Sequence, residues 1–319
     1  GATPFVLYPA PAPFPAEASN RWIHVPREVR VVEVLDDGAV VEEYAAAGQT
    51  WRELPVAMTP GSPPPAGAQQ GAINEWADSL LRGERNVQAS DGAFPIDPAT
   101  DILRGLRADH HAGRVVSSAI GSDIDAIVFS LLSVPSYLAV QGPPGTGKTY
   151  VGSHVIARLV NDHGWKVGVV AQSHAVVENM LDRVVAAGVP ASGVGKVLKG
   201  GARADGESFT VLPRNGLSAF QQAKSKGYVI GGTAWDFANV TRVDRRALDL
   251  LVVDEAGQFA LASTIAVSMS ARRLLLLGDP QQLPQVSLGT HPAPVDTSAL
   301  GWLMRGSAVL PEGYGYFLA

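Results

Sequence analysis

The 319-residue sequence contains no cysteine. Disulfide bonds, cysteine-ligated zinc and iron–sulfur clusters are therefore excluded within these residues. Long apolar runs are also missing, because no stretch approaches the ~18 residues that a membrane-spanning helix requires. The opening segment, GATPFVLYPAPAPFPAE, has neither a basic leader nor a continuous apolar block, so it is not a secretory signal. We therefore predict a cytoplasmic protein without a membrane partner.

Charge is scarce as well, at 17% of residues, and the net charge is −5. This balance argues against a uniformly basic surface for nucleic acid but leaves local patches open. Only 6 of the 25 basic residues are lysine, and the chain has 34 Gly and 23 Pro. Such a composition is typical of a GC-rich bacterial genome, so we expect a bacterial source. The length favours two domains, or one large domain with an appendage.

The N-terminal part of the sequence divides into an arm and a small module. Residues 1–20 are rich in proline, which predicts an extended, poorly packed arm. In residues 21–60, two β-branched runs flank Asp36-Asp37-Gly38, and Asp-Gly is a strong signal for a hairpin turn. These residues therefore predict a small β-rich module.

Residues 61–118 are predicted to hold a linker and a helical segment, because a Pro/Gly-rich stretch opens them. Apolar residues such as Ile73 and Trp76 follow at the spacing of one helix face, which favours core packing. His110 and His111 are adjacent in an irregular stretch. We interpret this pair as part of a solvated loop rather than as a metal site.

From residue 123 onward, helical stretches alternate with near-continuous apolar runs. This pattern indicates a mostly parallel sheet that is buried on both faces, and hence an α/β fold. We expect this lobe to span residues 119–290 and a C-terminal tail to span residues 291–319. The predicted strands cover residues 136–140, 166–171, 228–232, 248–254 and 272–278.

A glycine-rich loop follows the first of these strands and opens a helical stretch. Its sequence, GPPGTGKT, is the P-loop pattern G-x-x-x-x-G-K-T in the strand–loop–helix context that the pattern requires. Backbone N–H groups of such a loop wrap phosphates, Lys148 would contact the β- and γ-phosphates, and the Thr149 hydroxyl would hold Mg²⁺. The predicted nucleotide-binding residues of the loop are Gly142, Pro143, Pro144, Gly145, Thr146, Gly147, Lys148 and Thr149.

Two further polar loops directly follow apolar strands. Asp254 and Glu255 suit the metal and the attacking water of a phosphoryl transfer, and Gln282 suits the γ-phosphate or that water. Adjacent acids after a strand also occur at helix N-termini, but beside a P-loop the catalytic interpretation is favoured. Because ligands gather at the carboxyl ends of parallel strands, we expect all three loops to meet at one crevice. The predicted catalytic residues are Lys148, Glu255 and Gln282, the metal ligands are Thr149 and Asp254, and Gln258 and Asp279 are further nucleotide contacts.

Together, GPPGTGKT, DEAGQ and GDPQQLP resemble motifs I, II and III of superfamily 1 helicases, in the DEAxQ-type subgroup that includes the nonsense-mediated-decay helicase. The resemblance covers about residues 120–285. It implies that residues 119–290 are the first RecA-like lobe of an ATP-dependent helicase, with ATP and Mg²⁺ as cofactors, and that residues 21–60 take the place of a preceding β-barrel lobe. Some bacterial relatives fuse such a helicase to a RecB-like nuclease. An origin in such a fusion stays open, although the sequence shows no nuclease motif.

The resemblance also implies a single nucleic-acid strand as a partner, with DNA slightly favoured over RNA. Residues 169–181 resemble a motif that grips the nucleic-acid backbone, with Ser173 and His174 at its contact positions. Residues 229–235 resemble the next such strand end, with Thr233 as the phosphate contact. Short polar side chains at strand ends suit phosphate contacts that carry no sequence preference.

Residues 186–227 stand where this subgroup often has an insertion. They carry six basic and two acidic residues, a local net charge of +4. Two interpretations stay open, an electrostatic contact with nucleic acid and a solvated loop. The basic residues are Lys196, Lys199, Arg203, Arg214, Lys224 and Lys226.

The sequence departs from the family in several places. Family members usually have Asn at the position of His174 and Pro at that of Gln172, and Asp125 lies near the expected position of a Gln that reads adenine. Only 34 residues follow Gln285, and they contain none of motifs IV to VI of a second RecA-like lobe. We expect the chain to bind nucleotide, to hydrolyse it slowly, not to unwind duplexes, and to partner the second lobe of a parent protein.

The main alternative is a nucleotide-gated module that binds nucleic acid or protein without motor activity. The lack of the second lobe and the Pro- and β-rich N-terminal part favour this alternative. Another kind of P-loop NTPase, such as a regulatory ATPase, is disfavoured by the GDPQQLP sequence.

Overall fold

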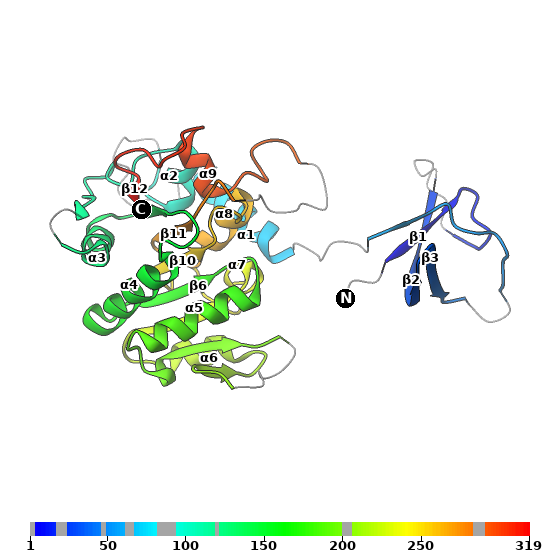
Figure 1. The fold of residues 1–319 in the computed structure, drawn as a ribbon, viewed down its shortest axis with the longest axis horizontal. Coiled ribbons are helices and arrows are strands. Elements are labelled where there is room, and N and C mark those ends of the chain that lie inside the picture. The colour runs from blue at the N-terminus through cyan, green and yellow to red at the C-terminus, as the bar shows by residue number, and fades with distance from the viewer. Residues whose placement is uncertain are drawn as a thin grey trace. The chain divides into compact units, whose positions relative to one another are not determined.

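The structure is a computed structural model, and it describes residues 4–16, 24–45, 49–60, 67–81, 94–118, 121–199, 206–282 and 291–319. The chain divides into two compact units, Gly1–Pro65 and Ala66–Ala319. The first unit is blue in Figure 1, and the second runs from cyan to red. Among the described residues, no helix combines the length and the apolarity that a membrane span needs.

The first unit contains an antiparallel sheet with the strand order β3-β2-β1-β4. The hairpin predicted around Asp36-Asp37-Gly38 is confirmed, because β2 and β3 pair on either side of this turn, down to the pair Leu35↔Gly38. The described strands form an open sheet, with β3 and β4 at its edges. The strands are β1 Phe5–Pro9, β2 His24–Leu35, β3 Gly38–Glu43 and β4 Ala57–Thr59.

The proline-rich N-terminal segment differs from the poorly packed arm that its composition predicts. Strand β1 pairs with both β2 and β4. Its Val6 and Tyr8 point to the same face of the sheet and are buried with Phe14 and Val29 in a small core. No proline interrupts FVLY, and its side chains alternate between the two faces of the sheet. This segment therefore packs as a strand.

The second unit is built on an eight-stranded sheet with the order β12-β5-β11-β10-β6-β9-β7-β8. All pairings among these strands are parallel. The predicted α/β fold class is therefore confirmed, and the sheet with its flanking helices is a RecA-like P-loop fold. The strands are β5 Tyr137–Gln141, β6 Lys166–Val170, β7 Val194–Val197, β8 Thr210–Leu212, β9 Tyr228–Gly232, β10 Leu250–Asp254, β11 Leu274–Gly278 and β12 Gly315–Phe317.

Two hydrophobic cores cover the two faces of this sheet. In β10, Leu250 and Val252 belong to the core formed with α3, α4 and α5, whereas Leu251 and Val253 belong to the core formed with α2, α8 and α9. This alternation explains the continuous apolar runs of the central strands. The helices are α1 Gly67–Leu81, α2 Pro98–Arg104, α3 Asp123–Ser133, α4 Lys148–His163, α5 His174–Ala186, α6 Gly216–Gln222, α7 Ala234–Ala238, α8 Leu261–Ser268 and α9 Ala299–Met304.

Residues outside the predicted lobe also belong to the second unit. Helix α1 confirms the predicted helical segment, and its Ile73 and Trp76 pack against the core. At the other end of the chain, β12 lies in the predicted tail and pairs with β5.

The histidine pair is only partly as predicted. His110 is exposed, but the His111 imidazole lies 3.0 Å from the Asp101 carboxylate of α2, and both of these side chains are buried. This contact between a loop and a helix could not be predicted from the spacing of the two histidines.

Candidate functional site

The P-loop connects β5 to α4. Gly145 and Gly147 have positive φ angles of 86° and 78°, which glycine adopts far more readily than other residues. A Cβ atom on Gly142 would lie 2.5 Å from the Thr146 hydroxyl oxygen, so a side chain would not fit there. The Lys148 ammonium donates hydrogen bonds to two carbonyls of the same loop. The N-terminus of α4 and Lys148 therefore face the space where a phosphate group would bind.

Asp254 and Glu255 lie at the end of β10. Asp254 has only 5% of its surface exposed. The pKa of Asp254 is raised to about 6, mainly by this burial. The hydrogen bond from the Glu255 N–H opposes the rise in pKa, the charge of the Glu255 carboxylate adds to it, and the charge of Lys148 opposes it. Glu255 has a φ of 56°, a left-handed conformation that costs a non-glycine residue energy and that clusters at functional sites. Asp254 is the last residue of β10 and Glu255 begins the turn that follows, whereas α8 begins only at Leu261.

The loop after β11 packs backbone to backbone against this turn. A Cβ atom on Gly257 would lie 2.1 Å from the Asp279 carbonyl oxygen, and one on Gly278 would lie 2.5 Å from the Gly257 nitrogen. The Gly142 N–H also donates a 3.1 Å hydrogen bond to the Gly278 carbonyl. The three loops therefore meet at the carboxyl edge of β5, β11 and β10, which are neighbours in the sheet.

A pocket of about 210 Å³ lies where the three loops meet, and we call it the loop pocket. Across it, the Gln258 amide nitrogen lies 3.4 Å from the Gln282 amide oxygen. Four lining residues were not among the predicted site residues. Gly257 and Gly278 belong to the recognised motifs, whereas nothing in the sequence distinguishes Val176 and Asn179 of α5 from other helix residues. Leu283 and Pro284 of GDPQQLP lie outside the described residues. The lining residues are Lys148, Thr149, Val176, Asn179, Asp254, Glu255, Gly257, Gln258, Gly278, Asp279 and Gln282.

The chemistry of the loop pocket fits a polyphosphate with Mg²⁺. The Thr149 hydroxyl and the Asp254 carboxylate are hard oxygen donors, which Mg²⁺ prefers, and phosphate oxygens and water usually complete its coordination. The backbone N–H groups of the P-loop and the Lys148 ammonium are suitable partners for the anionic phosphates.

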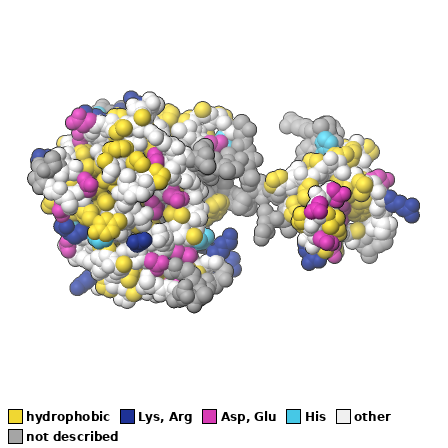
Figure 2. All heavy atoms as spheres, in the orientation of Figure 1, with side chains coloured by type: hydrophobic (Ala, Val, Ile, Leu, Met, Phe, Trp, Pro, Cys, Tyr) yellow, Lys and Arg dark blue, Asp and Glu magenta, His cyan; other side chains and the backbone are white. Residues whose placement is uncertain are grey.

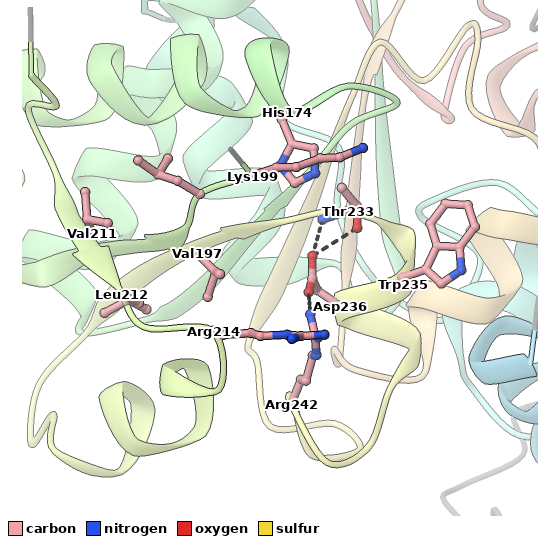
Figure 3. Close-up of a pocket in the computed structure, with 11 residues that line it drawn as sticks. His174, Val197, Lys199, Val211, Leu212, Arg214, Thr233, Trp235, Asp236 and Arg242 are labelled. Atoms are coloured by element: carbon pink, nitrogen blue, oxygen red, sulfur yellow. Dashed lines mark hydrogen bonds and ion pairs between the residues drawn. The ribbon is translucent and has the colours of Figure 1, made fainter. Parts of the chain in front are cut away.

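A second pocket, of about 470 Å³, lies near the carboxyl ends of β6, β7 and β9, and we call it the β9 pocket (Figure 3). The N–H and the hydroxyl of Thr233 donate to the Asp236 carboxylate, at 2.8 and 2.9 Å, and Asp236 also pairs with Arg242. Both Thr233 donors are therefore engaged within the protein. The lining residues are His174, Val197, Leu198, Lys199, Val211, Leu212, Arg214, Thr233, Trp235, Asp236 and Arg242.

Ser173 and His174 have different positions at the start of α5. Ser173 is the N-cap of the helix, and its hydroxyl oxygen accepts a 3.2 Å hydrogen bond from the Val176 N–H. Only His174 of the two lines the β9 pocket. Its Nδ1 atom lies 2.9 Å from the ammonium nitrogen of Lys196 on β7.

The basic segment over residues 186–227 is not a separate solvated loop in its described part. Strands β7 and β8 extend the sheet, and α6 packs against them. The basic residues have different surroundings: Lys196 is buried, Lys224 donates to the Ser192 carbonyl, and Lys199 and Arg214 line the β9 pocket. Arg203 lies outside the described residues.

Two of the positions that depart from the family have partners within the protein. The Gln172 amide donates a 3.1 Å hydrogen bond to the Gln258 carbonyl, which connects the end of β6 to the loop pocket. The Asp125 carboxylate accepts a 2.8 Å hydrogen bond from Arg158 of α4.

Comparison with known proteins shows which family the chain belongs to. The AAA domain family matches residues 125–298, which is more than half of the chain. The DNA replication ATP-dependent helicase/nuclease JHS1 of Arabidopsis thaliana is 24% identical over 54% of the chain and 13% of its own length. The DNA replication ATP-dependent helicase/nuclease DNA2 of Xenopus laevis is 28% identical over 46% of the chain and 14% of its own length. The chain thus corresponds to a small part of these relatives.

Solved helicase structures are also similar. The UvsW helicase of bacteriophage T4 is 13% identical, with 78% of this chain and 77% of that chain covered and a TM-score of 0.38. The arterivirus nonstructural protein 10 helicase, in complex with DNA, is 22% identical, with 57% and 35% covered and a TM-score of 0.34. Residues 125–298 therefore form a helicase-like P-loop domain, and the chain belongs to the AAA domain family.

Proposed function

We propose that the second unit is an ATP-binding and ATP-hydrolysing motor lobe of a superfamily 1 helicase of the DEAxQ type. The observation that carries this proposal is the convergence of the three motif loops on the loop pocket, held together by the backbone contacts of Gly142, Gly257 and Gly278. The first unit then takes the place of the β-barrel lobe that precedes this motor lobe in the subgroup.

In this proposal each residue of the loop pocket has a separate role. Lys148 and the P-loop N–H groups bind the β- and γ-phosphates, and Thr149 and Asp254 hold Mg²⁺. Bound Mg²⁺ neutralises charge on the phosphate oxygens. Glu255 accepts a proton from the attacking water, and Gln282 orients that water or the γ-phosphate.

The nucleotide site is tested by titrating the full chain with a fluorescent ATP analogue in the presence of Mg²⁺. Replacing Lys148 with Ala removes a charge-assisted contact, so we expect the affinity to fall by about 10- to 100-fold. Lys166→Ala is the matched control, because this exposed lysine begins β6, at the opposite end of the strand from the pocket. An unchanged affinity of Lys148→Ala would overturn the assignment.

We further propose that a single nucleic-acid strand, DNA in preference to RNA, passes over the β9 pocket. The support is the position of this pocket beside the loop pocket in the sheet order, together with the positive charges of Lys199 and Arg214. A second RecA-like lobe of the parent protein would complete the strand-binding surface and supply arginines that stabilise the transferring phosphate.

One observation supports the alternative function, a nucleotide-gated binding module. The first unit exposes large apolar side chains, among them Val34 of β2 at 79% and Leu54, which precedes β4, at 84%. Stimulation of ATP turnover by single-stranded DNA in the parent protein supports the motor. Turnover that stays unaffected by DNA supports the binding module.

A further inference from the structure

Lys196 is a lysine inside the sheet. It lies in the middle of β7, and none of its side chain is exposed. Lysine is almost never fully buried unless it is paired, because removing an ammonium group from water is costly. The burial of Lys196 therefore calls for specific partners within the protein, and it excludes a direct contact of this side chain with nucleic acid.

The ammonium group of Lys196 has one partner for each of its three N–H bonds. Its nitrogen lies 2.9 Å from His174 Nδ1, 2.9 Å from Glu178 Oε1 and 3.2 Å from the Val197 carbonyl oxygen. His174 and Glu178 are four residues apart and so occupy the same face of α5. The Glu178 carboxylate balances the charge of the Lys196 ammonium group.

These contacts determine which nitrogen of His174 carries the proton. An ammonium group donates hydrogen bonds and accepts none, so Nδ1 of His174 must be the acceptor. The proton of the neutral imidazole then lies on Nε2, and Nε2–H is the remaining donor of the ring. Burial, followed by the charge of Lys196, lowers the pKa of His174, and Lys199 also lowers it; Asp236 and Glu178 act in the opposite direction.

Besides His174, the side chains that line the β9 pocket offer two neutral donors, the Thr233 hydroxyl and the Trp235 indole N–H. Thr233 uses both its N–H and its hydroxyl to bind Asp236, as Figure 3 shows, and Ser173 does not line the pocket. His174 does line it. Its ring is short and stiff compared with the side chains of Lys199 and Arg214, so its orientation is fixed once Nδ1 is bound.

We propose that Lys196 is a positioning residue that holds His174 as its Nε2–H tautomer, so that a neutral imidazole donates a hydrogen bond to a backbone phosphate of the strand in the β9 pocket. The part of this inference that concerns the phosphate rests on the proposed nucleic-acid function. The part that concerns the tautomer rests only on the contacts of Lys196.

The test replaces Lys196 with Met, which keeps the length of the stem and removes the donor. Long-range ¹H–¹⁵N spectra of the full chain labelled with ¹⁵N-histidine report the tautomer, and His174→Gln assigns the signals. We expect a single Nε2–H tautomer of His174 in the wild type and a mixture of tautomers in Lys196→Met. Affinity for fluorescent single-stranded oligo-dT should fall about tenfold, the effect of one lost hydrogen bond to a charged group.

Lys166→Met is the matched control, since it removes the same charge from an exposed position at the start of β6, outside the basic segment and at the opposite end of that strand from the β9 pocket. It should leave both the tautomer and the affinity for oligo-dT unchanged within about twofold. If Lys196→Met fails to fold, the double variant Glu178→Gln/Lys196→Met, which leaves no unpaired carboxylate, is read in the same way.

Each outcome has a distinct meaning. A His174 tautomer that is the same in wild type and Lys196→Met overturns the positioning role. A changed tautomer with unchanged oligo-dT affinity overturns the phosphate contact. If the wild-type chain binds no oligo-dT, the proposed nucleic-acid function fails, while the spectra still decide the role of Lys196.

Discussion

Asp254 and Glu255 are neighbours in the sequence but have different surroundings. Asp254 is buried at the strand end, where its carboxylate accepts the Glu255 N–H. Glu255 is half-buried and lies on the left-handed turn that lines the loop pocket. A buried carboxylate suits a fixed metal ligand, whereas a more accessible one suits proton transfer from water.

This difference leads to a prediction for Glu255→Gln. The amide keeps the shape of the side chain but does not accept the proton, so ATP hydrolysis should fall by about 10²- to 10⁴-fold. ATP affinity should stay within about threefold of the wild type, because the phosphate contacts of Lys148 are intact. Release of labelled phosphate at saturating ATP measures the first quantity.

The control for this substitution is Glu312→Gln, which changes an exposed glutamate of the same unit. It should hydrolyse ATP at the wild-type rate. Wild-type hydrolysis by Glu255→Gln would show that this carboxylate takes no part in the reaction.

Sequence patterns identify residues whose type and local spacing carry the chemistry. Lys148, Asp254 and Gln282 each follow a strand in a recognisable motif, and the structure brings all three to one pocket. The role of Lys196 could not be predicted in this way. Its partners His174 and Glu178 come from another element, so the sequence shows only one more basic residue in a positive segment.

At the scale of elements, the loops around the loop pocket pack so closely that Gly257 and Gly278 have no room for a side chain. Gly257→Ala would place a methyl group 2.1 Å from the Asp279 carbonyl oxygen, and the turn and the neighbouring loop would have to separate. We expect the free energy of unfolding to fall by about 2 kcal/mol or more. Urea unfolding of the full chain, followed by circular dichroism, measures this change.

Gly71→Ala should stabilise the protein, in contrast to Gly257→Ala. Gly71 is exposed in the interior of α1, and its added Cβ atom would meet nothing within 4 Å. Alanine should stabilise this helix by about 0.5–1 kcal/mol, because glycine loses more backbone freedom on folding. Equal stability of Gly257→Ala and Gly71→Ala would contradict the close packing of the loops.

The five-residue strands β5, β6, β9, β10 and β11 could be predicted, but the shorter strands at and next to the edges of the sheet could not. Strands β5, β6, β9, β10 and β11 are nearly continuous apolar runs because both faces are buried. In contrast, β7 contains a lysine, and β8 and β12 have three residues each. These short strands are stabilised mainly by pairing with the strands beside them, and local sequence carries no strong sign of that pairing.

At the scale of the whole molecule, the acidic net charge and a nucleic-acid partner are compatible. Figure 2 shows basic and acidic side chains interspersed over the face in view, without one continuous basic surface. The positive charges on which the proposed strand binding depends are local, at Lys199 and Arg214 of the β9 pocket. The binding of oligo-dT should therefore depend on these few positions rather than on overall charge.

The central claim is that the three loops of the second unit form one site for ATP and a divalent cation. A crystal structure of the full chain with a non-hydrolysable ATP analogue and Mn²⁺, recorded for anomalous scattering, tests it most directly. We predict the triphosphate in the loop pocket against Lys148, with the Mn²⁺ peak next to Thr149 and Asp254. A nucleotide bound elsewhere, or a metal peak away from both of these residues, would contradict the account.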